Sequence, residues 1–297
     1  MKKTPAFATP ALITVAAFWG AGFVIMKPAI DKEPINDFLA TRFTVATIVM
    51  VLARPSVLKK INWDVLRTAV PLGLMLGGGY ITQTIALQAT TAAVTAFLTG
   101  LYVVLTPILG WVVLRQRLDR KVFWGVALAT VGLALISMNG FTIEAGQLWG
   151  LLCALLYAAH IVGLGVWSRG RDIYAMTVLQ LAAVALLTWL FALPDGYQPP
   201  PSLDVWLAIG FTAVLATALA FFVQTWAQSK MDASRVAIIL TSEIVFAALI
   251  AVLVGQESLS LKTTLGGILM VTAMLMVEWP RRGSRVAAEL LSTPHLE

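Results

Sequence analysis

The stretch LDVWLAIGFTAVLATALAFFVQTW, residues 203–226, indicates the fold class of this chain, because Asp204 is the only charged residue in it. As a helix it would be about 36 Å long, at about 1.5 Å per residue, which exceeds the roughly 30 Å hydrocarbon core of a bilayer. Similar apolar stretches recur along the whole chain. Hydrophobic residues make up 59% of the sequence and charged residues 12%, about half the charged share of a soluble domain. The sequence therefore predicts a polytopic membrane protein.

Ten membrane-spanning helices are predicted from the positions of the charge clusters and of the Pro and Gly breaks. Helices are favoured over strands because the apolar runs are continuous, whereas the strands of a membrane barrel alternate in hydrophobicity. Only a few residues around 89–91 separate the third segment from the fourth, so a count of nine stays open. The predicted segments are 10–27, 35–53, 68–87, 92–114, 121–139, 147–167, 173–193, 203–226, 234–254 and 263–279.

The distribution of basic residues predicts the orientation. All but four of the 21 Lys and Arg residues fall in alternate loops on one side, and such an excess marks the cytoplasmic side. The four exceptions are Lys27, Lys32, Arg42 and Lys262. Both termini are then cytoplasmic, including the tail 280–297, and the protein is expected in the plasma membrane, the inner membrane of a bacterium. The apolar run after Met1-Lys2-Lys3 is too long for a signal peptide, so we expect an uncleaved first span.

Charge and motif content argue against several other classes of protein. The net charge of +6 is explained by the basic loops, so no nucleic-acid partner is expected. Cys153 is the only cysteine, which excludes an intrachain disulfide and a cysteine metal site. The sequence contains no His-Glu-x-x-His motif, no Gly-x-Gly-Asp motif and no P-loop. We therefore expect no catalytic residues, no metal and no cofactor, and ATP is not the predicted energy source.

The two halves of the chain match each other. With a shift of 141 residues, Gln83-Thr84-x-Ala86 aligns with Gln224-Thr225-x-Ala227, and the same register gives 11 identities across residues 83–128. Each half holds five spans, an odd number, so the second half must enter the membrane in the opposite orientation. The predicted units are residues 10–139 and 147–279. Inverted repeats are typical of secondary transporters, whose substrate site lies near the midplane where the halves meet.

The chain resembles the drug/metabolite transporter superfamily in its ten-helix EamA branch, and it is similar to the YddG-type amino-acid exporters. The resemblance covers residues 10–280. It departs from the family pattern at Ile244, where proline is frequent, and at Arg115-Gln116, where Gly-Glu is frequent. The motifs that carry it are Ala17-Phe18-Trp19-Gly20, Arg42-Phe43, Ala86-Leu87-Gln88-Ala89-Thr90 with Ala92-Ala93, Leu118 through Gly132, Ser242-Glu243 and Gln256-Glu257-Ser258-Leu259-Ser260.

This resemblance implies a two-repeat, all-α fold and a secondary transporter that exports amino acids or related metabolites by alternating access. The expected partners are a small-molecule substrate and the lipid bilayer, and a monomer is predicted. Two alternatives stay open at this point, an intramembrane enzyme and a channel. Saturable flux with trans-stimulation in liposomes separates a carrier from a channel.

Arg42, His160 and Glu243 lie well inside predicted spans, away from the span ends. A charge there costs about 2.5–3.5 kcal/mol at the bilayer centre. Glu243 could meet a substrate ammonium or exchange a proton, or it could lock helix packing through a hydrogen bond. His160 could line a cavity or donate one hydrogen bond between helices. Arg42 could capture a substrate carboxylate. We favour a structural role for it, in which the side chain extends outward toward the interface or pairs within the protein.

Aromatic and amide residues form a second group of candidates. Tyr80 and Phe221 align at the 141-residue shift, and each lies about one helical turn before a glutamine, Gln83 or Gln224, so each pair shares a helix face. Two such faces meeting at a pseudo-twofold axis would suit an amphipathic substrate with an apolar side chain, although core packing is the alternative for any single ring. The predicted cavity-lining residues are Trp19, Tyr80, Gln83, Tyr102, Tyr157, His160, Phe221, Gln224 and Glu243.

Glycine and proline mark positions where helices can bend or approach closely. Gly77, Gly78 and Gly79 give the third span a narrow face, and Gly100 and Pro107 interrupt the fourth. A proline inside a helix removes one backbone hydrogen bond, whereas small residues alone serve close helix packing. Both roles, hinge and packing, stay open for these five positions.

Overall fold

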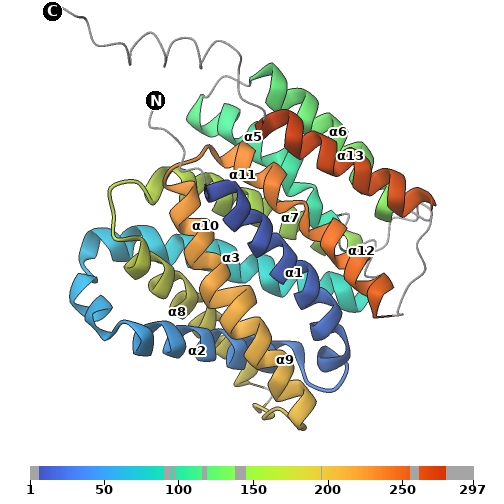
Figure 1. Cartoon of the computed structure of the whole chain (residues 1–297). Helices are drawn as coiled ribbons and strands as arrows, with labels where there is room; N and C mark the ends of the chain where they lie inside the picture. The colour runs from blue at the N-terminus through green and yellow to red at the C-terminus, as the bar shows by residue number, and fades with distance from the viewer. Residues whose placement is uncertain are drawn as a thin grey trace, which may run out of the picture.

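The computed structural model is a bundle of helices (Figure 1). It describes residues 7–89, 95, 98–115, 119–137, 145–194, 196–254 and 261–278, and no strand occurs within these ranges. By length and composition, seven helical stretches in the described part of the chain can cross a membrane, and Leu98–Leu114 and Thr264–Ala273 are shorter apolar helices. The predicted all-α polytopic fold is confirmed.

The helices follow the predicted spans closely. The first half contains α1 (Ala8–Ile30), α2 (Ile35–Ala53), the short 3-10 helix η1 (Pro55–Lys60), α3 (Trp63–Ala89), α5 (Tyr102–Leu114) and α6 (Arg120–Ser137). The second half contains α7 (Ala145–Trp167), α8 (Ile173–Ala192), α9 (Leu203–Ala213), the π-helix η2 (Val214–Leu219), α10 (Ala220–Gln228), α11 (Ala233–Leu240), α12 (Glu243–Leu253) and α13 (Leu261–Glu278). The predicted start of the fourth span, around residues 92–97, and the tail 280–297 lie largely outside the described residues.

Polar residues and prolines set several helix ends. The Asp172 carboxylate accepts a hydrogen bond from the Ala175 amide at 3.0 Å and caps α8, and the Asn62 side chain accepts one from the Val65 amide at 3.0 Å near the start of α3. Such caps satisfy amide groups that have no partner within the helix. Pro55 lies two residues beyond Ala53, the last residue of α2, where its ring cannot continue the helix.

The eighth and ninth predicted spans each contain an interruption of the regular α-helix. The eighth span contains the six-residue π-helix η2 between α9 and α10. The ninth span is broken at Thr241 and Ser242, whose hydroxyls donate to the carbonyls of Ile238 at 2.7 Å and Ile239 at 2.6 Å. Hydroxyls that bond back to the preceding turn compete with the helical hydrogen-bond pattern. The ninth predicted span, 234–254, therefore consists of two helices, α11 and α12, separated by the turn at Thr241 and Ser242.

Contacts between the halves follow a regular pattern. Helices in corresponding positions pack together, α2 against α8 and α6 against α13, and α6 and α13 lie side by side at one edge of the bundle (Figure 1). The contact of α3 with α7 has its counterpart in the contact of α1 with α10, and the contact of α1 with α12 has its counterpart in that of α7 with α5. Exchanging the two halves thus maps each of these pairings onto another, as a pseudo-twofold axis requires.

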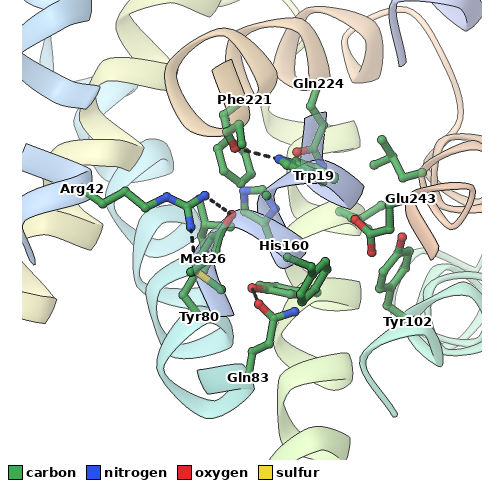
Figure 2. Close-up of a pocket in the computed structure, with 17 residues that line it drawn as sticks. Trp19, Met26, Arg42, Tyr80, Gln83, Tyr102, His160, Phe221, Gln224 and Glu243 are labelled. Carbon is green, nitrogen blue, oxygen red and sulfur yellow. Dashed lines mark hydrogen bonds between the residues drawn. The ribbon is translucent and has the colours of Figure 1, made fainter. Parts of the chain in front are cut away.

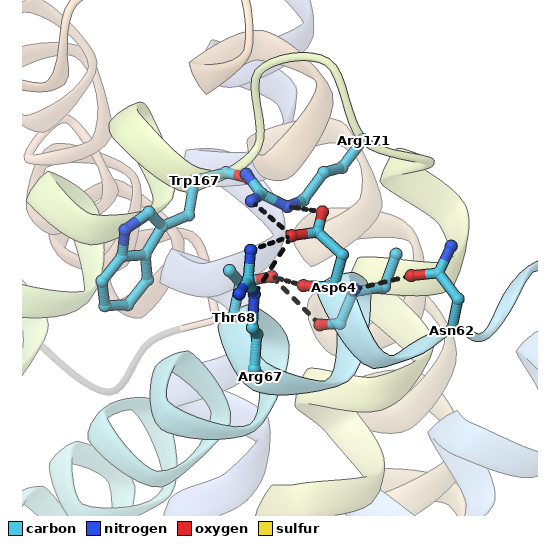
Figure 3. Close-up of polar contacts among 7 residues, drawn as sticks. Asn62, Asp64, Arg67, Thr68, Trp167 and Arg171 are labelled. Carbon is cyan, nitrogen blue, oxygen red and sulfur yellow. Dashed lines mark hydrogen bonds and ion pairs between the residues drawn. The ribbon is translucent and has the colours of Figure 1, made fainter.

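Polar contacts tie the halves together at both ends of the bundle. At one end, Asp64 of α3 accepts hydrogen bonds from Arg171, with Nε at 2.7 Å and Nη2 at 3.0 Å, and from Arg67 (Figure 3). At the other end, Asp37 of α2 accepts a hydrogen bond at 2.9 Å from the amide of Gln198, in the α8–α9 connection. The cavity described next lies between these ties.

Candidate functional site

A cavity lies where the two halves of the bundle meet, and residues of α1, α2, α3, α5, α7, η2, α10, α11 and α12 line it (Figure 2). It holds about 70 Å³ of free volume, room for a few water molecules, since one water needs about 10–15 Å³ on this measure. A substrate larger than that can enter only if the wall side chains move. All nine predicted cavity-lining residues border this one cavity, and their role in binding a substrate stays a prediction: Trp19, Tyr80, Gln83, Tyr102, Tyr157, His160, Phe221, Gln224 and Glu243.

Aromatic rings form one wall of the cavity. Tyr80 and Phe221, which align in the internal repeat, meet edge to face with ring centroids 6.2 Å apart. Tyr157 lies 5.8 Å from Tyr80, and Trp19 lies 5.5 Å from Phe221, again between centroids. Edge-to-face and tilted contacts of this kind stabilise rings beyond the apolar area they bury. The rings come from α1, α3, α7 and α10, so both halves build this wall.

The two aligned glutamines make different hydrogen bonds. The Gln83 carbonyl oxygen accepts from the Tyr157 hydroxyl at 3.3 Å. Gln224 donates to the Gln228 side chain at 3.0 Å, and Gln228 in turn donates to the backbone carbonyl of Ile161 in α7 at 2.7 Å. This relay joins α10 to α7 at the end of the cavity nearest the α10–α11 turn. The buried Gln224 Oε1 has no hydrogen-bond partner among the described residues.

The π-helix η2 holds two first-half residues at the cavity. The Trp19 indole donates to the Ala216 carbonyl at 2.8 Å, and Arg42 Nε donates to the Thr217 hydroxyl at 2.9 Å. A π-helix shifts the backbone pairing by one residue relative to an α-helix and is frequent at functional sites. The eighth span thus offers a carbonyl and a hydroxyl to α1 and α2, a feature that no sequence signal indicated.

Arg42 points into the protein, so of the two structural roles considered for it the contacts agree with pairing inside the protein and not with outward extension. The residue is only 3% exposed and lines the cavity. Its guanidinium lies 3.5 Å from the Tyr80 hydroxyl and 3.6 Å from the Met26 sulfur, and it sits over the Tyr80 ring at 5.1 Å from the centroid. Each of these partners is a neutral group.

Glu243 and Tyr102 occupy corresponding places in the two halves. At the 141-residue shift they align with each other, and each is the first residue of a helix that follows a break, α12 and α5. Their side chains face each other at the cavity edge (Figure 2). Gly20 lets α1 pack closely against the start of α12, because a Cβ atom at this position would lie only 2.6 Å from the Glu243 carbonyl oxygen. Discontinuous helices of this kind border the substrate sites of many transporters.

His160 combines both roles considered for it. It lines the cavity, and its Nε2 lies 2.8 Å from the side-chain oxygen of Gln180 in α8. Because that oxygen can only accept, the imidazole donates through Nε2. Gln180 also donates to the Met176 carbonyl at 3.2 Å. The ring is therefore held by a cross-helix hydrogen bond while its edge faces Phe221, with centroids 6.2 Å apart.

The candidate hinge residues lie at close helix contacts or near a break. Gly77 faces Val184 and Leu187 of α8, Gly78 faces Leu156 of α7, and Gly79 lies against the Tyr157 ring. Gly100 directly precedes the turn at Leu101 that separates it from α5, and Pro107 lies inside α5. The contacts of the three α3 glycines agree with close packing, and a hinge role stays a prediction.

The cavity also contains residues that the sequence did not single out. Arg42 also lines it; the sequence marked this residue as a charge inside a span but favoured a structural role. The others are small or apolar and look like any lipid-facing or core residue in the sequence. They are Gly22, Phe23, Met26, Leu76, Ile161, Ala216 and Leu240. Within the described ranges no group of three or more His, Cys, Asp and Glu residues is placed to hold a metal ion.

Comparison with known proteins gives a consistent family assignment. A protein of Archaeoglobus fulgidus named "Uncharacterized transporter" is 33% identical over 272 residues, covering 91% of this chain and 85% of its own length. The Bacillus subtilis protein "Uncharacterized transporter YoaV" is 24% identical over 280 residues, 89% of this chain and 94% of its own. A crystal structure shares the fold with a TM-score of 0.76 at 19% identity, covering 96% of this chain and 99% of that one. The EamA-like transporter family matches residues 7–138 and 144–279. The chain therefore belongs to the EamA-like transporter family.

Proposed function

We propose that this chain is a secondary transporter that exports amino acids, with aromatic and other hydrophobic ones as the expected cargo, and related metabolites across the plasma membrane by alternating access. The observation that carries the proposal is the cavity between the halves, which combines an aromatic wall with amide and charged groups. Sites for small molecules have this composition, mostly apolar with a few polar groups that orient the ligand.

The cavity chemistry matches an amphipathic solute. Tyr80, Phe221 and Trp19 offer ring faces and edges for an apolar side chain. Arg42 offers a guanidinium and Glu243 a carboxyl group, and the Gln224 oxygen, which has no partner among the described residues, offers a hydrogen-bond acceptor. A purely apolar solute would leave these polar groups unpaired, which costs free energy in a buried site. A hydrophobic amino acid carries both kinds of surface.

Alternating access supplies the transport step in this proposal. The free volume is too small for an amino acid in the conformation described, and polar contacts join the two halves at both ends of the bundle. Two halves with similar helix pairings can exchange conformations, so that one state opens the cavity inward and the other opens it outward. Solute gradients then drive export, in a monomer whose termini both lie in the cytoplasm.

Transport by purified protein in proteoliposomes tests the proposal. Radiolabelled phenylalanine should show saturable uptake that is stimulated by unlabelled phenylalanine on the other side of the membrane. A competition screen of the twenty amino acids then ranks the cargo. Non-saturable flux would instead indicate a channel. Absence of flux for every amino acid, from protein shown to be folded, would refute amino-acid transport, and chemical change of the solute would indicate an intramembrane enzyme.

A matched pair of tryptophan variants checks that the cavity is the site. Trp19→Phe removes the indole N–H that bonds the Ala216 carbonyl and shrinks the aromatic wall, so we expect the KM for phenylalanine to rise several-fold. Trp206→Phe alters an exposed tryptophan of α9 that does not line the cavity and should leave the KM unchanged. Equal effects of both substitutions would place the site elsewhere.

A further inference from the structure

Arg42 is a buried cation whose charge no described residue balances. Its hydrogen-bond partners among the described residues are the Thr217 hydroxyl, the Tyr80 hydroxyl and the Met26 sulfur, at 2.9, 3.5 and 3.6 Å, and all three are neutral. Within the described ranges no carboxylate lies within 4.0 Å of the guanidinium. An arginine side chain keeps its proton inside proteins, so the charge persists. A buried charge is normally paired, because leaving it unpaired is costly.

The guanidinium is also not saturated with hydrogen bonds. It carries five N–H groups in a planar fork, and the structure pairs each of its three nitrogens once. Two N–H groups, one on each terminal nitrogen, are left over. Arg42 also borders the free volume of the cavity. The arrangement suits a planar group that accepts two parallel hydrogen bonds, which is how carboxylates bind arginine.

Glu243 does not serve as the missing counter-ion. It also lines the cavity and is 7% exposed. Its carboxyl group faces Tyr102, and in Figure 2 Arg42 and Glu243 lie at opposite sides of the labelled cluster, with Trp19 and His160 between them. No ion pair joins the two residues. The cavity therefore holds a positive group that has no counter-ion within the described ranges and that an incoming ligand can pair.

We propose that Arg42 is the carboxylate-binding residue of the cavity, so that the transported solute carries a carboxylate and binds with it against the guanidinium. The contact of Nε with Thr217 holds the fork in place, and the Tyr80 and Phe43 rings support it from the side, at 5.1 and 5.5 Å from the guanidinium carbon. The apolar part of the solute then lies along the wall formed by Tyr80, Phe221 and Trp19. This inference rests on the proposed transport function and specifies which solutes the cavity selects.

Three analogues of one solute separate the carboxylate from the rest of the molecule. In the proteoliposome assay, unlabelled phenylalanine, phenylalaninamide and 3-phenylpropionate compete with labelled phenylalanine; the second lacks the carboxylate and the third lacks the ammonium group. We expect phenylalanine and 3-phenylpropionate to inhibit at concentrations at least tenfold lower than phenylalaninamide. Equal inhibition by phenylalanine and its amide would overturn the assignment while leaving amino-acid transport intact.

Variants then assign the preference to this side chain. Arg42→Gln should raise the KM for phenylalanine at least tenfold and remove the preference of the acid over the amide, whereas Arg42→Lys should keep part of it. Arg54→Gln is the matched control. Arg54 lies at the end of the same helix, over the Tyr174 ring, and its substitution should change neither the KM for phenylalanine nor the preference of the acid over the amide. If Arg42→Gln unfolds, the analogue series on the wild-type protein still decides. An Arg42→Gln protein that is folded and keeps the wild-type preference would refute the proposal.

Discussion

Single residues decide how closely the halves of this transporter meet. Gly20 brings α1 against the start of α12, and Glu33, in the α1–α2 connection, is buried with neither carboxylate oxygen hydrogen-bonded among the described residues. Each position gives a substitution whose effect on stability has a definite sign. The effect at Gly20 arises from a contact with a segment far away in the chain, and the effect at Glu33 arises from burial. The sequence pattern indicates neither the contact nor the burial.

We expect Gly20→Ala to destabilise the protein. The new Cβ would lie 2.6 Å from the Glu243 oxygen and 2.7 Å from the Ala247 amide nitrogen, and such overpacking costs about 1–3 kcal/mol. Gly22→Ala is the control, since its Cβ would lie 3.7 Å from Ala216, an ordinary contact, and alanine favours a helix by about 1 kcal/mol. Thermal unfolding in detergent measures both. A lower Tm for Gly22→Ala than for Gly20→Ala would contradict the packing described.

Glu33 makes stability depend on pH. Burial, with a smaller contribution from the nearby charge of Asp37, raises its pKa from 4.5 to about 7. The folded state therefore binds its proton more tightly than the unfolded state, and stability falls as the pH rises from about 4.5 to about 7. The shift corresponds to at most about 3.5 kcal/mol, at about 1.4 kcal/mol per pKa unit.

Glu33→Gln should remove this dependence. The variant should be more stable than the wild type at pH 8 and close to it at pH 4.5, measured as Tm across that range. Asp31→Asn, an exposed neighbour in the same connection, should follow the wild-type curve. Parallel curves for Glu33→Gln and the wild type would show that Glu33 does not titrate in this range.

At the scale of elements, the ends of broken or distorted helices border the cavity. α5 and α12 begin at the aligned residues Tyr102 and Glu243, and η2 interrupts the eighth span beside Trp19 and Arg42. The break before α5 was expected from Gly100, because glycine weakens a helix. The break before α12 was not, since Thr241 and Ser242 occur in continuous helices as well. Whether a helix breaks or continues at a Thr-Ser pair depends on the helices that pack against it.

The hydrogen bonds from Gln224 through Gln228 to the Ile161 carbonyl should hold α10 against α7 and so restrict access to the cavity between these two helices. Gln228→Leu removes the Gln228–Ile161 hydrogen bond, the one that joins α10 to α7, and such a bond is worth about 0.5–1.5 kcal/mol. We expect roughly a 2- to 10-fold faster reaction of a cysteine at position 161 with a membrane-impermeant thiol reagent added from the predicted cytoplasmic side, in a background without Cys153.

The exposed Gln88→Leu provides the matched control for that experiment and should leave the labelling rate unchanged. Labelling of position 161 that rises only from the opposite side would mean that the relay closes the other end of the cavity. An unchanged rate in Gln228→Leu would mean that the apolar packing of α10 on α7 closes this path without the relay.

The whole molecule is best explained by two similar halves that lie antiparallel in the membrane. The pairings of α2 with α8 and of α6 with α13 join corresponding helices, and the remaining major contacts exchange with one another. The ties at Asp64 and Asp37 then lie on opposite faces of the membrane. The basic residues near Asp64 mark that face as the predicted cytoplasmic one.

Topology reporters test this arrangement directly. Fusions at the C-terminus, within η1 and at Gly170 in the α7–α8 turn should report the cytoplasm, whereas an insertion at Tyr197 in the α8–α9 connection should report the opposite side. Gly170 suits an insertion because no neighbouring atom lies within 4 Å of its Cβ position. A C-terminal reporter on the outside would refute the even number of spans and the antiparallel halves together.

The sequence by itself determined the membrane class, the approximate helices, the internal repeat and the nine candidate residues that share one cavity. These follow from hydrophobicity and from a register of 11 identities, both of which are local in the chain. Only the tertiary structure decided that Arg42 points inward, that His160 is hydrogen-bonded to Gln180 and that a carbonyl of η2 accepts a hydrogen bond from Trp19. An apolar helix face looks the same in sequence whether lipid or another helix covers it, so the partner of a buried polar group is fixed only when the helices pack.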